Sequence, residues 1–296
     1  MEINVDVDGV RLDNFLIDKV DKSRSKIQSM IKNCDILVNG NVCKSSYIVK
    51  NGDLISITFR EDEVIDAKAE KMDLDIVYED KDVIVVNKKN GVVVHPAVGN
   101  TSGTLVNGLL YHSDSLSGVN GSFRPGIVHR IDAFTTGLLM VAKNDFAHEF
   151  LAKQLEEKTT HRKYYALVWG VITEDTGTID APIGRDINDR KKMAVVSGGK
   201  HAITHFKVLK RFKNATLVEV VLETGRTHQI RVHMNYIGHP VVNDPVYGRR
   251  KLIDDSGQCL HAKELGFVHP RTLKMMMFDS ELPKCFLNIL KMFEEE

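Results

Sequence analysis

The order of strand-like and helix-like segments after residue 73 limits the possible folds most strongly. Short apolar runs predict five strands: residues 83–87, 91–95, 137–142, 163–169 and 215–222. A helix is expected to follow Asn144, which can cap its first turn, and another to begin near Thr227. Because helices and strands do not alternate regularly, the sequence predicts an α+β fold with a mixed, largely antiparallel sheet over residues 73–296.

The first 62 residues have the pattern of a separate, small α/β domain. A helix is expected over residues 23–32, with apolar residues on one side and the cations Arg24 and Lys26 on the other. An Asn-Gly dipeptide at residues 39–40, between two short apolar runs, is typical of a hairpin turn. Residues 1–62 are therefore expected to fold as two helices and a small sheet.

Charge is distributed unevenly along the chain. Residues 61–80 contain nine acids and two lysines, and we expect an acidic linker over residues 63–72. The 296 residues as a whole have 40 Lys and Arg against 40 Asp and Glu, so the net charge gives no sign of a polyanionic partner. Residues 184–213, however, hold nine basic and two acidic residues. This segment is either a solvated basic loop or a contact for a phosphate backbone.

Several classes of protein are unsupported by the sequence. No apolar run approaches the ~18 residues of a membrane span, and the first ten residues are acidic, so a cytoplasmic location is expected. The four cysteines form no C-x-x-C pair, and neither a nucleotide-binding glycine motif nor an H-E-x-x-H motif occurs. We therefore expect no cofactor and no metal centre.

Three polar segments contain the residues with catalytic potential. In residues 126–145, Asp132 precedes a buried strand, where a nearby cation would be needed to keep it ionised; an Asx-turn is the alternative role. On the strand at 163–169, Tyr164 has the small Ala166 beside it, which suits stacking on a flat ligand as well as packing in the core. The third segment has four polar residues at a helix start, a placement that indicates a phosphate or carboxylate partner: Arg226, His228, Gln229 and Arg231.

Together these segments resemble the RluA-type family of pseudouridine synthases, most closely its RluD-like branch. His-Arg-Ile-Asp at 129–132, followed by Thr-Thr-Gly at 135–137, is similar to the family signature H-R-L-D-x-x-T-S-G, and residues 225–231 match G-R-T-H-Q-[IL]-R. Arg-Leu-Asp at 11–13 and Val-Asn-Gly at 38–40 resemble the S4 RNA-binding domain.

The resemblance implies catalytic roles for three residues. Asp132 would be the essential acid, acting as nucleophile or base, and Tyr164 would pack on the target base. Arg231 would pair with Asp132, with Arg226 as the alternative. Eleven residues are expected to contact RNA: His129, Arg130, Arg226, His228, Gln229, Arg185, Arg190, Lys191, Lys192, Arg24 and Lys26.

The expected function is isomerisation of specific uridines to pseudouridine in structured RNA, with large-subunit ribosomal RNA as the first substrate. Transfer RNA is an alternative substrate, and a non-catalytic RNA-binding assembly factor for the ribosome is an alternative function. A glycosidase-like hydrolase would need two cooperating carboxylates, and no second acid accompanies Asp132 in these segments.

Overall fold

The computed structural model describes residues 1–21, 24–59, 67–97, 99–119, 121, 124–189, 191–248 and 251–295. The chain forms two compact units, Met1–Val64 and Ile65–Glu296. Each described hydrophobic cluster lies wholly within one of these units. The two units are therefore treated separately below.

The N-terminal unit packs two short helices on a four-stranded sheet. Its elements are β1 (Glu2–Asn4), α1 (Leu12–Phe15), α2 (Arg24–Lys32), β2 (Ile36–Val38), β3 (Asn41–Val42) and β4 (Leu54–Ile57), with strand order β1-β4-β2-β3. The apolar face of α2 enters the core through Ile27, Met30 and Ile31. The predicted hairpin is confirmed, because Asn39 and Gly40 both have positive φ, as a tight turn between β2 and β3 requires.

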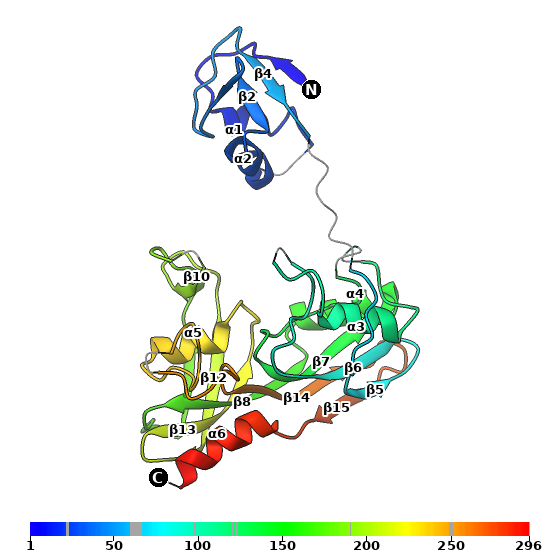
Figure 1. The fold of residues 1–296 in the computed structure, drawn as a ribbon, viewed down its shortest axis with the longest axis vertical. Coiled ribbons are helices and arrows are strands. Elements are labelled where there is room, and N and C mark those ends of the chain that lie inside the picture. The colour runs from blue at the N-terminus through cyan, green and yellow to red at the C-terminus, as the bar shows by residue number, and fades with distance from the viewer. Residues whose placement is uncertain are drawn as a thin grey trace. The chain divides into compact units, whose positions relative to one another are not determined.

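The larger unit is built on a nine-stranded sheet with strand order β5-β6-β7-β14-β8-β13-β12-β9 and β15 paired to β14 (Figure 1). Its strands are β5 (Ile76–Glu79), β6 (Val83–Lys88), β7 (Thr136–Ala142), β8 (His161–Trp169), β9 (Thr176–Asp180), β12 (Ile203–Arg211), β13 (Ala215–Leu222), β14 (Leu260–Val268) and β15 (Met275–Asp279). Within the described chain, β7 and β14 form the one parallel pair of named strands. The predicted α+β class with a largely antiparallel sheet is confirmed.

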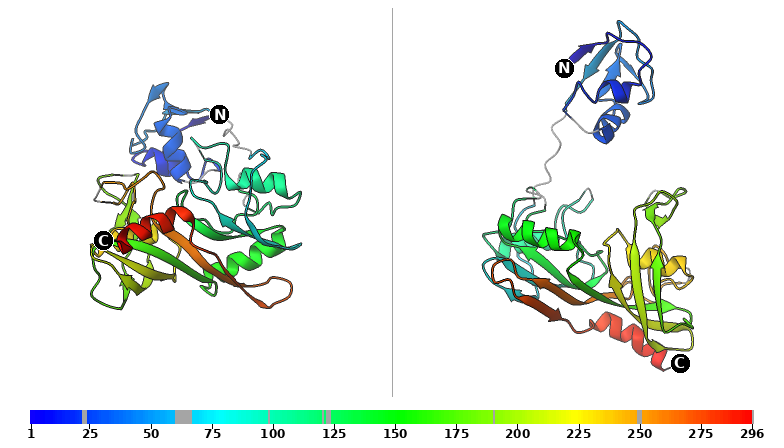
Figure 2. Two further views of the ribbon diagram at one scale, coloured as in Figure 1. Left: turned by 60° about the horizontal axis from the view of Figure 1, so that its bottom comes forward. Right: turned by 180° about the vertical axis from the view of Figure 1, so that it is seen from behind.

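Helices cover both faces of this sheet. These are α3 (Leu105–His112), α4 (Asp145–Glu156), α5 (Gln229–Tyr236) and α6 (Lys284–Glu294). Helices α3 and α5 share one cluster with Tyr164, Ala166 and Val168 of β8. The opposite side of β8 contributes Leu167 to a cluster with α6, which lies along β8 and β13 (Figure 2). This division is the alternation of faces expected of a strand, and it puts Tyr164 on the α5 side.

One predicted strand was wrong, and one predicted helix begins two residues later than expected. Residues 91–95 form no strand, because the carbonyls of Val93 and Val94 accept hydrogen bonds from Leu105 and Val106 at the start of α3. The helix expected near Thr227 begins at Gln229, since His228 has the left-handed φ of 57°.

The described part of the predicted linker, residues 67–72, has no helix or strand and is attached to α3. Asn107 of α3 donates to the Lys68 carbonyl and accepts from the Glu70 backbone N–H. Residues 63–66 lie outside the described residues.

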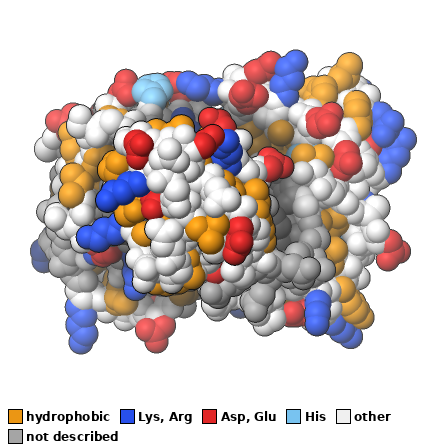
Figure 3. All heavy atoms as spheres, turned by 90° about the horizontal axis from the view of Figure 1, so that it is seen from above, with side chains coloured by type: hydrophobic (Ala, Val, Ile, Leu, Met, Phe, Trp, Pro, Cys, Tyr) orange, Lys and Arg blue, Asp and Glu red, His pale blue; other side chains and the backbone are white. Residues whose placement is uncertain are grey.

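A basic hairpin projects from the large sheet. It consists of β10 (Ile183–Arg185) and β11 (Met193–Val195), which form their own two-stranded sheet (Figure 1). On the face in Figure 3, basic and acidic side chains are interspersed, in keeping with the net charge of zero. None of the helices in the described residues is long and apolar enough to span a membrane.

Candidate active site

Asp132 lies in a turn that is anchored where β7 begins. Its carbonyl accepts a hydrogen bond from the Thr135 backbone N–H at 3.1 Å. Two residues later, Gly137 has φ +107°, and a Cβ there would be 2.3 Å from the Ala262 carbonyl oxygen of β14. Glycine is therefore needed for the close approach of β7 to β14, and this approach sets the position of the Asp132 turn.

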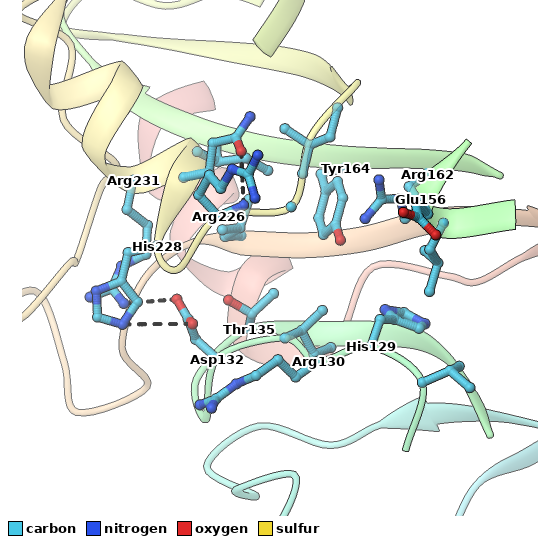
Figure 4. A pocket seen from close by; sticks show the side chains of 18 residues that line it. His129, Arg130, Asp132, Thr135, Glu156, Arg162, Tyr164, Arg226, His228 and Arg231 are labelled. Atoms are coloured by element: carbon cyan, nitrogen blue, oxygen red, sulfur yellow. Dashed lines mark hydrogen bonds and ion pairs between the residues drawn. The ribbon is translucent and has the colours of Figure 1, made fainter. Parts of the chain in front are cut away.

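Arg231 faces Asp132 across the cavity (Figure 4) and also contacts a second carboxylate, Asp244. Arg231 Nη1 is 2.8 Å from Asp132 Oδ2, while Nε and Nη2 are 2.7 and 2.8 Å from the two oxygens of Asp244. Arg226 is exposed and donates instead to the His201 carbonyl. Of the two arginines that the sequence left open, Arg231 is the partner of Asp132.

Asp244 was not predicted from the sequence. Its side chain is fully buried and also accepts hydrogen bonds from the backbone N–H groups of Val246 and Tyr247. Burial raises its pKa, but hydrogen bonds from Arg231 and the backbone outweigh burial and hold the pKa below its usual value. The same two carboxylates raise the pKa of Arg231 despite its burial. Asp244 follows Arg231 by 13 residues, a spacing that gives no signal in sequence.

His228 also lies beside the Asp132 carboxylate. Its Nε2 is 3.7 Å from Asp132 Oδ1, and its Nδ1 is 2.8 Å from the Tyr247 hydroxyl. That hydroxyl accepts a hydrogen bond from the Met193 backbone N–H, so its own hydrogen can be donated to His228 Nδ1. Burial is the largest influence on His228 and lowers its pKa. A neutral His228 accepting at Nδ1 carries its hydrogen on Nε2, which faces Asp132.

Asp132, His228 and Arg231 line a cavity of about 350 Å³ together with Tyr164. Tyr164 is 7% exposed, and burial raises the pKa of its hydroxyl. Apolar side chains complete the walls: Val128, Ile131, Leu155, Leu222, Ile230 and Leu260. The volume and the mixture of apolar walls with a few polar groups are typical of a small-ligand site.

Within the His129–Asp132 segment, His129 and Arg130 have different contacts and different exposure. His129 lines the cavity and accepts a hydrogen bond from the Met140 backbone N–H, and burial lowers its pKa to about 3. Arg130 is exposed at the cavity, and its Nη1 lies 3.1 Å from His95 Nε2. Arg130 is the more exposed of the two and is therefore the more accessible to a polyanion.

Gln229 has no capacity left for RNA, contrary to the prediction. Its amide nitrogen donates to the Ile203 carbonyl and to Thr204 Oγ1, and its oxygen accepts from Thr224 Oγ1 and the Arg226 N–H. These four bonds use every donor and acceptor of the amide. Gln229 instead holds the loop that leads into α5.

The other predicted RNA contacts lie outside this cavity. Arg185 is at the end of β10, and Lys191 and Lys192 precede β11 in the basic hairpin. Arg190 lies outside the described residues. In the N-terminal unit, Arg24 donates to the buried Asp13, and Lys26 lies on the same helix α2. The structure thus brings together the predicted catalytic residues but not all of the predicted cations.

A buried lysine next to the site was also missed. Lys88 is 2% exposed and its Nζ donates to the carbonyls of Lys89, Val92 and Ala133. Burial lowers its pKa to about 7, while the charge on Asp132 acts in the opposite direction. Since Ala133 follows Asp132, this hydrogen bond helps to fix the turn that contains Asp132. In the sequence, Lys88 appears only as the last residue of a strand, and nothing there indicates that it contacts the Asp132 turn.

Among the described residues, one cluster has the composition of a metal site: Asp80, Asp82 and His269. Its carboxylates are already engaged, because Arg271 donates twice to Asp82 and the Asp80 oxygens accept from Tyr78, His269 and two backbone N–H groups. We therefore interpret this cluster as a network of ion pairs that stabilises the fold, not as a metal site.

The sequence of this chain matches two family models and several known proteins. Residues 82–236 match the family model for RNA pseudouridylate synthase, and residues 10–55 match that for the S4 domain. An uncharacterized RNA pseudouridine synthase of Bacillus subtilis is 56% identical over 282 residues, covering 95% of this chain and 93% of that protein. Ribosomal large subunit pseudouridine synthase D of Pseudomonas aeruginosa is 43% identical over 309 residues, covering 100% of this chain and 95% of that protein.

A solved structure has the same fold. Human RNA pseudouridylate synthase domain containing 1 aligns with a TM-score of 0.57 and 25% identity, covering 80% of this chain and 98% of that one. The cavity residues Asp132, Tyr164 and Arg231 all lie within the segment that the synthase family model matches.

Proposed function

The chain belongs to the RNA pseudouridylate synthase family, isomerases that act on RNA, and from this premise we propose that Asp132 is its catalytic carboxylate and large-subunit ribosomal RNA its substrate. The observation that carries the catalytic assignment is the ion pair of Asp132 with Arg231 in a cavity that also holds Tyr164.

The geometry supports an ionised Asp132. The guanidinium of Arg231 faces one carboxylate oxygen, and Asp244 behind it keeps the arginine charged and correctly turned. Asp132 itself is 19% exposed, so its second oxygen remains accessible from the cavity. An ionised carboxylate can attack carbon or remove a proton, and both routes begin from this arrangement.

The reaction requires an extruded base. Isomerisation breaks the C–N glycosidic bond of uridine and rejoins the base through C5, so no atom is gained or lost overall. Leaving the stack costs a few kcal/mol, and stacking of the base on Tyr164 would offset about 1–3 kcal/mol of this. The apolar walls around the tyrosine favour a flat, weakly polar ring such as uracil.

Two observations support ribosomal RNA as the substrate. The relative from Pseudomonas aeruginosa named for the large ribosomal subunit matches this chain from end to end. The exposed cations of the basic hairpin, including Arg185 and Lys191, suit a large folded RNA with many phosphates.

We expect Asp132→Asn to abolish pseudouridine formation on transcribed large-subunit ribosomal RNA while its Kd for that RNA stays within about threefold. The amide keeps the shape of the carboxylate but can neither attack nor accept a proton. The matched control is Asp114→Asn, which changes an exposed aspartate outside the cavity and should keep full activity. An active Asp132→Asn enzyme would refute the catalytic assignment.

The substrate is tested by mapping pseudouridines in ribosomal and transfer RNA from cells with and without the protein. We expect sites to disappear from large-subunit ribosomal RNA in its absence. Loss confined to transfer RNA would refute the proposed substrate but leave the role of Asp132 untouched.

A further inference from the structure

Arg162 of β8 is a buried cation without a protein partner. Its side chain lines the cavity, the residue is 8% exposed, and its Nε is buried without a hydrogen bond. No hydrogen bond or ion pair joins its guanidinium to another residue in the described part of the chain. Glu156 lines the same cavity without forming an ion pair with it (Figure 4). A buried guanidinium left unsatisfied is costly, so this site is built for an acceptor that is not part of the protein.

The local structure keeps the guanidinium at the cavity wall. A Cβ on Gly225 would lie 3.1 Å from Arg162 Nη1, so the absence of a side chain at Gly225 gives the guanidinium its space. Gly225 itself lines the cavity. Gly225 therefore leaves the space in the cavity wall that the Arg162 guanidinium occupies.

Arg162 and Tyr164 lie on the same side of β8, because residues two apart on a strand share a face and are separated by about 7 Å. The charges of Arg162 and Asp132 both act on the Tyr164 hydroxyl, so the tyrosine is close to each of them. In Figure 4 Tyr164 lies between Arg162 on one side and Asp132 on the other. The cavity thus has a carboxylate end and a guanidinium end, with the ring between them.

We propose that Arg162 recognises the extruded base by donating hydrogen bonds to an exocyclic carbonyl oxygen of uracil. This inference rests on the proposed function. If Asp132 acts at the sugar or glycosidic carbon, the sugar lies at the carboxylate end and the base extends over Tyr164 towards Arg162. Guanidinium is a donor only, so it suits the acceptor oxygens of uracil and disfavours the amino group that cytosine has in place of O4.

A backbone phosphate fits this position less well. Phosphates stay with the sugar near the cavity mouth, where the exposed Arg130 and Arg226 are available. Arg162 is more buried than Asp132, whose side chain is 19% exposed. The deeper group is expected to meet the part of the nucleotide that enters furthest, which is the base.

The experiment compares wild type, Arg162→Met and Arg162→Lys on transcribed large-subunit ribosomal RNA. We expect Arg162→Met to lower the single-turnover rate at saturating RNA by about 10- to 100-fold, the effect of losing a charged hydrogen bond. Its Kd and the salt dependence of binding should be unchanged, and Arg162→Lys should retain an intermediate rate. The melting temperature of Arg162→Met should stay within about 2 °C of wild type, because no intramolecular bond is lost.

Thio-substituted RNA identifies the acceptor. Replacing O2 or O4 of the target uracil by sulfur weakens one acceptor at a time. We expect one of the two substitutions to slow wild type and to have no additional effect on Arg162→Met.

Three results would overturn the inference. A wild-type rate for Arg162→Met at saturating RNA would exclude base recognition, and a weaker Kd with a salt slope lower by about one would assign Arg162 to a phosphate. A large fall in melting temperature with a normal rate would make it structural. A wild-type enzyme inactive on this transcript would instead refute the proposed substrate, together with what rests on it.

Discussion

At the scale of single residues, the site depends on one arginine shared by two carboxylates. Arg231 is 4% exposed and Asp244 is fully buried, so neither is stable there without the other. Asp132 then receives a guanidinium whose orientation is already set by its bidentate contact with Asp244. The proposed catalytic carboxylate is thereby positioned through Asp244, a fully buried residue outside the cavity lining.

We expect Asp244→Asn to destabilise the protein by about 3–5 kcal/mol, because it leaves Arg231 buried with a weakened partner. The isomerisation rate should also fall, while RNA affinity is retained. Chemical denaturation and single-turnover kinetics measure the two effects. Asp175→Asn breaks an exposed Arg–Asp pair and serves as the control, with an expected loss below about 1 kcal/mol. Equal losses in the two variants would contradict this account.

A second prediction concerns pH and His261, which is 1% exposed and contacts Thr136 Oγ1 and Ser280 Oγ. Burial lowers its pKa to about 4. The unfolded chain binds a proton there near pH 6.5 but the folded protein does not until about pH 4, so stability falls as the pH falls between these values.

The contribution of His261 should reach about 2 kcal/mol between pH 6.5 and pH 5. We expect His261→Asn to reduce the slope of unfolding free energy against pH in this range by about one proton. His201→Asn, the same substitution at an exposed position, is the matched control. An unaltered slope in His261→Asn would show that this histidine is not buried in its neutral form.

At the scale of elements, the turn that contains Asp132 is held by the contact of β7 with β14. Gly137 makes this close approach possible, and the neighbouring Thr136 is bonded to His261 of β14. Lys88 at the end of β6 adds a bond to the Ala133 carbonyl. Three strands therefore converge on the residues that flank Asp132.

We expect Gly137→Ala to cost at least 2 kcal/mol of stability and most of the activity. A Cβ would collide with the Ala262 backbone, and the positive φ of +107° is strained for alanine. Gly118→Ala is the matched control, since a Cβ there meets nothing within 4 Å. Thermal melts of both variants test this, and a Gly137→Ala protein as stable as the control would contradict the close approach.

These contacts mark the limit of prediction from sequence. The strands at 83–87, 137–142, 163–169 and 215–222 were predicted correctly. A buried strand has a continuous or alternating run of apolar residues, which can be recognised within a short stretch of sequence. The strand predicted at 91–95 was wrong. The backbone carbonyls of this segment bond to the first residues of α3, a contact that the sequence of the segment does not indicate. Gln229 was misassigned because its hydrogen bonds depend on the fold: two of its four partners, Ile203 and Thr204, lie about 25 residues away in the sequence.

At the scale of the whole molecule, the chain has two units with separate cores. No described hydrophobic cluster mixes residues from the two. Such an arrangement allows each unit to fold without the other.

We expect a chain lacking residues 1–64 to fold cooperatively and to keep the single-turnover rate at saturating RNA. Its affinity for RNA should weaken, and the slope of log affinity against log salt should become shallower because phosphate contacts are lost. Denaturation curves and binding titrations over a range of salt measure both properties. A truncated chain that does not fold would show that the cores depend on each other.

The sequence by itself determined the α+β class, because apolar patterning is set by consecutive residues, and its motifs predicted that Asp132, Tyr164 and Arg231, which line one cavity, share a site. The tertiary structure alone decided that Arg231 rather than Arg226 meets Asp132, that Asp244 holds this arginine, and that Arg162 ends in the cavity without a partner. Hydrogen bonds and ion pairs act over about 3 Å. Which distant residues come that close is settled only when the strands and helices have packed.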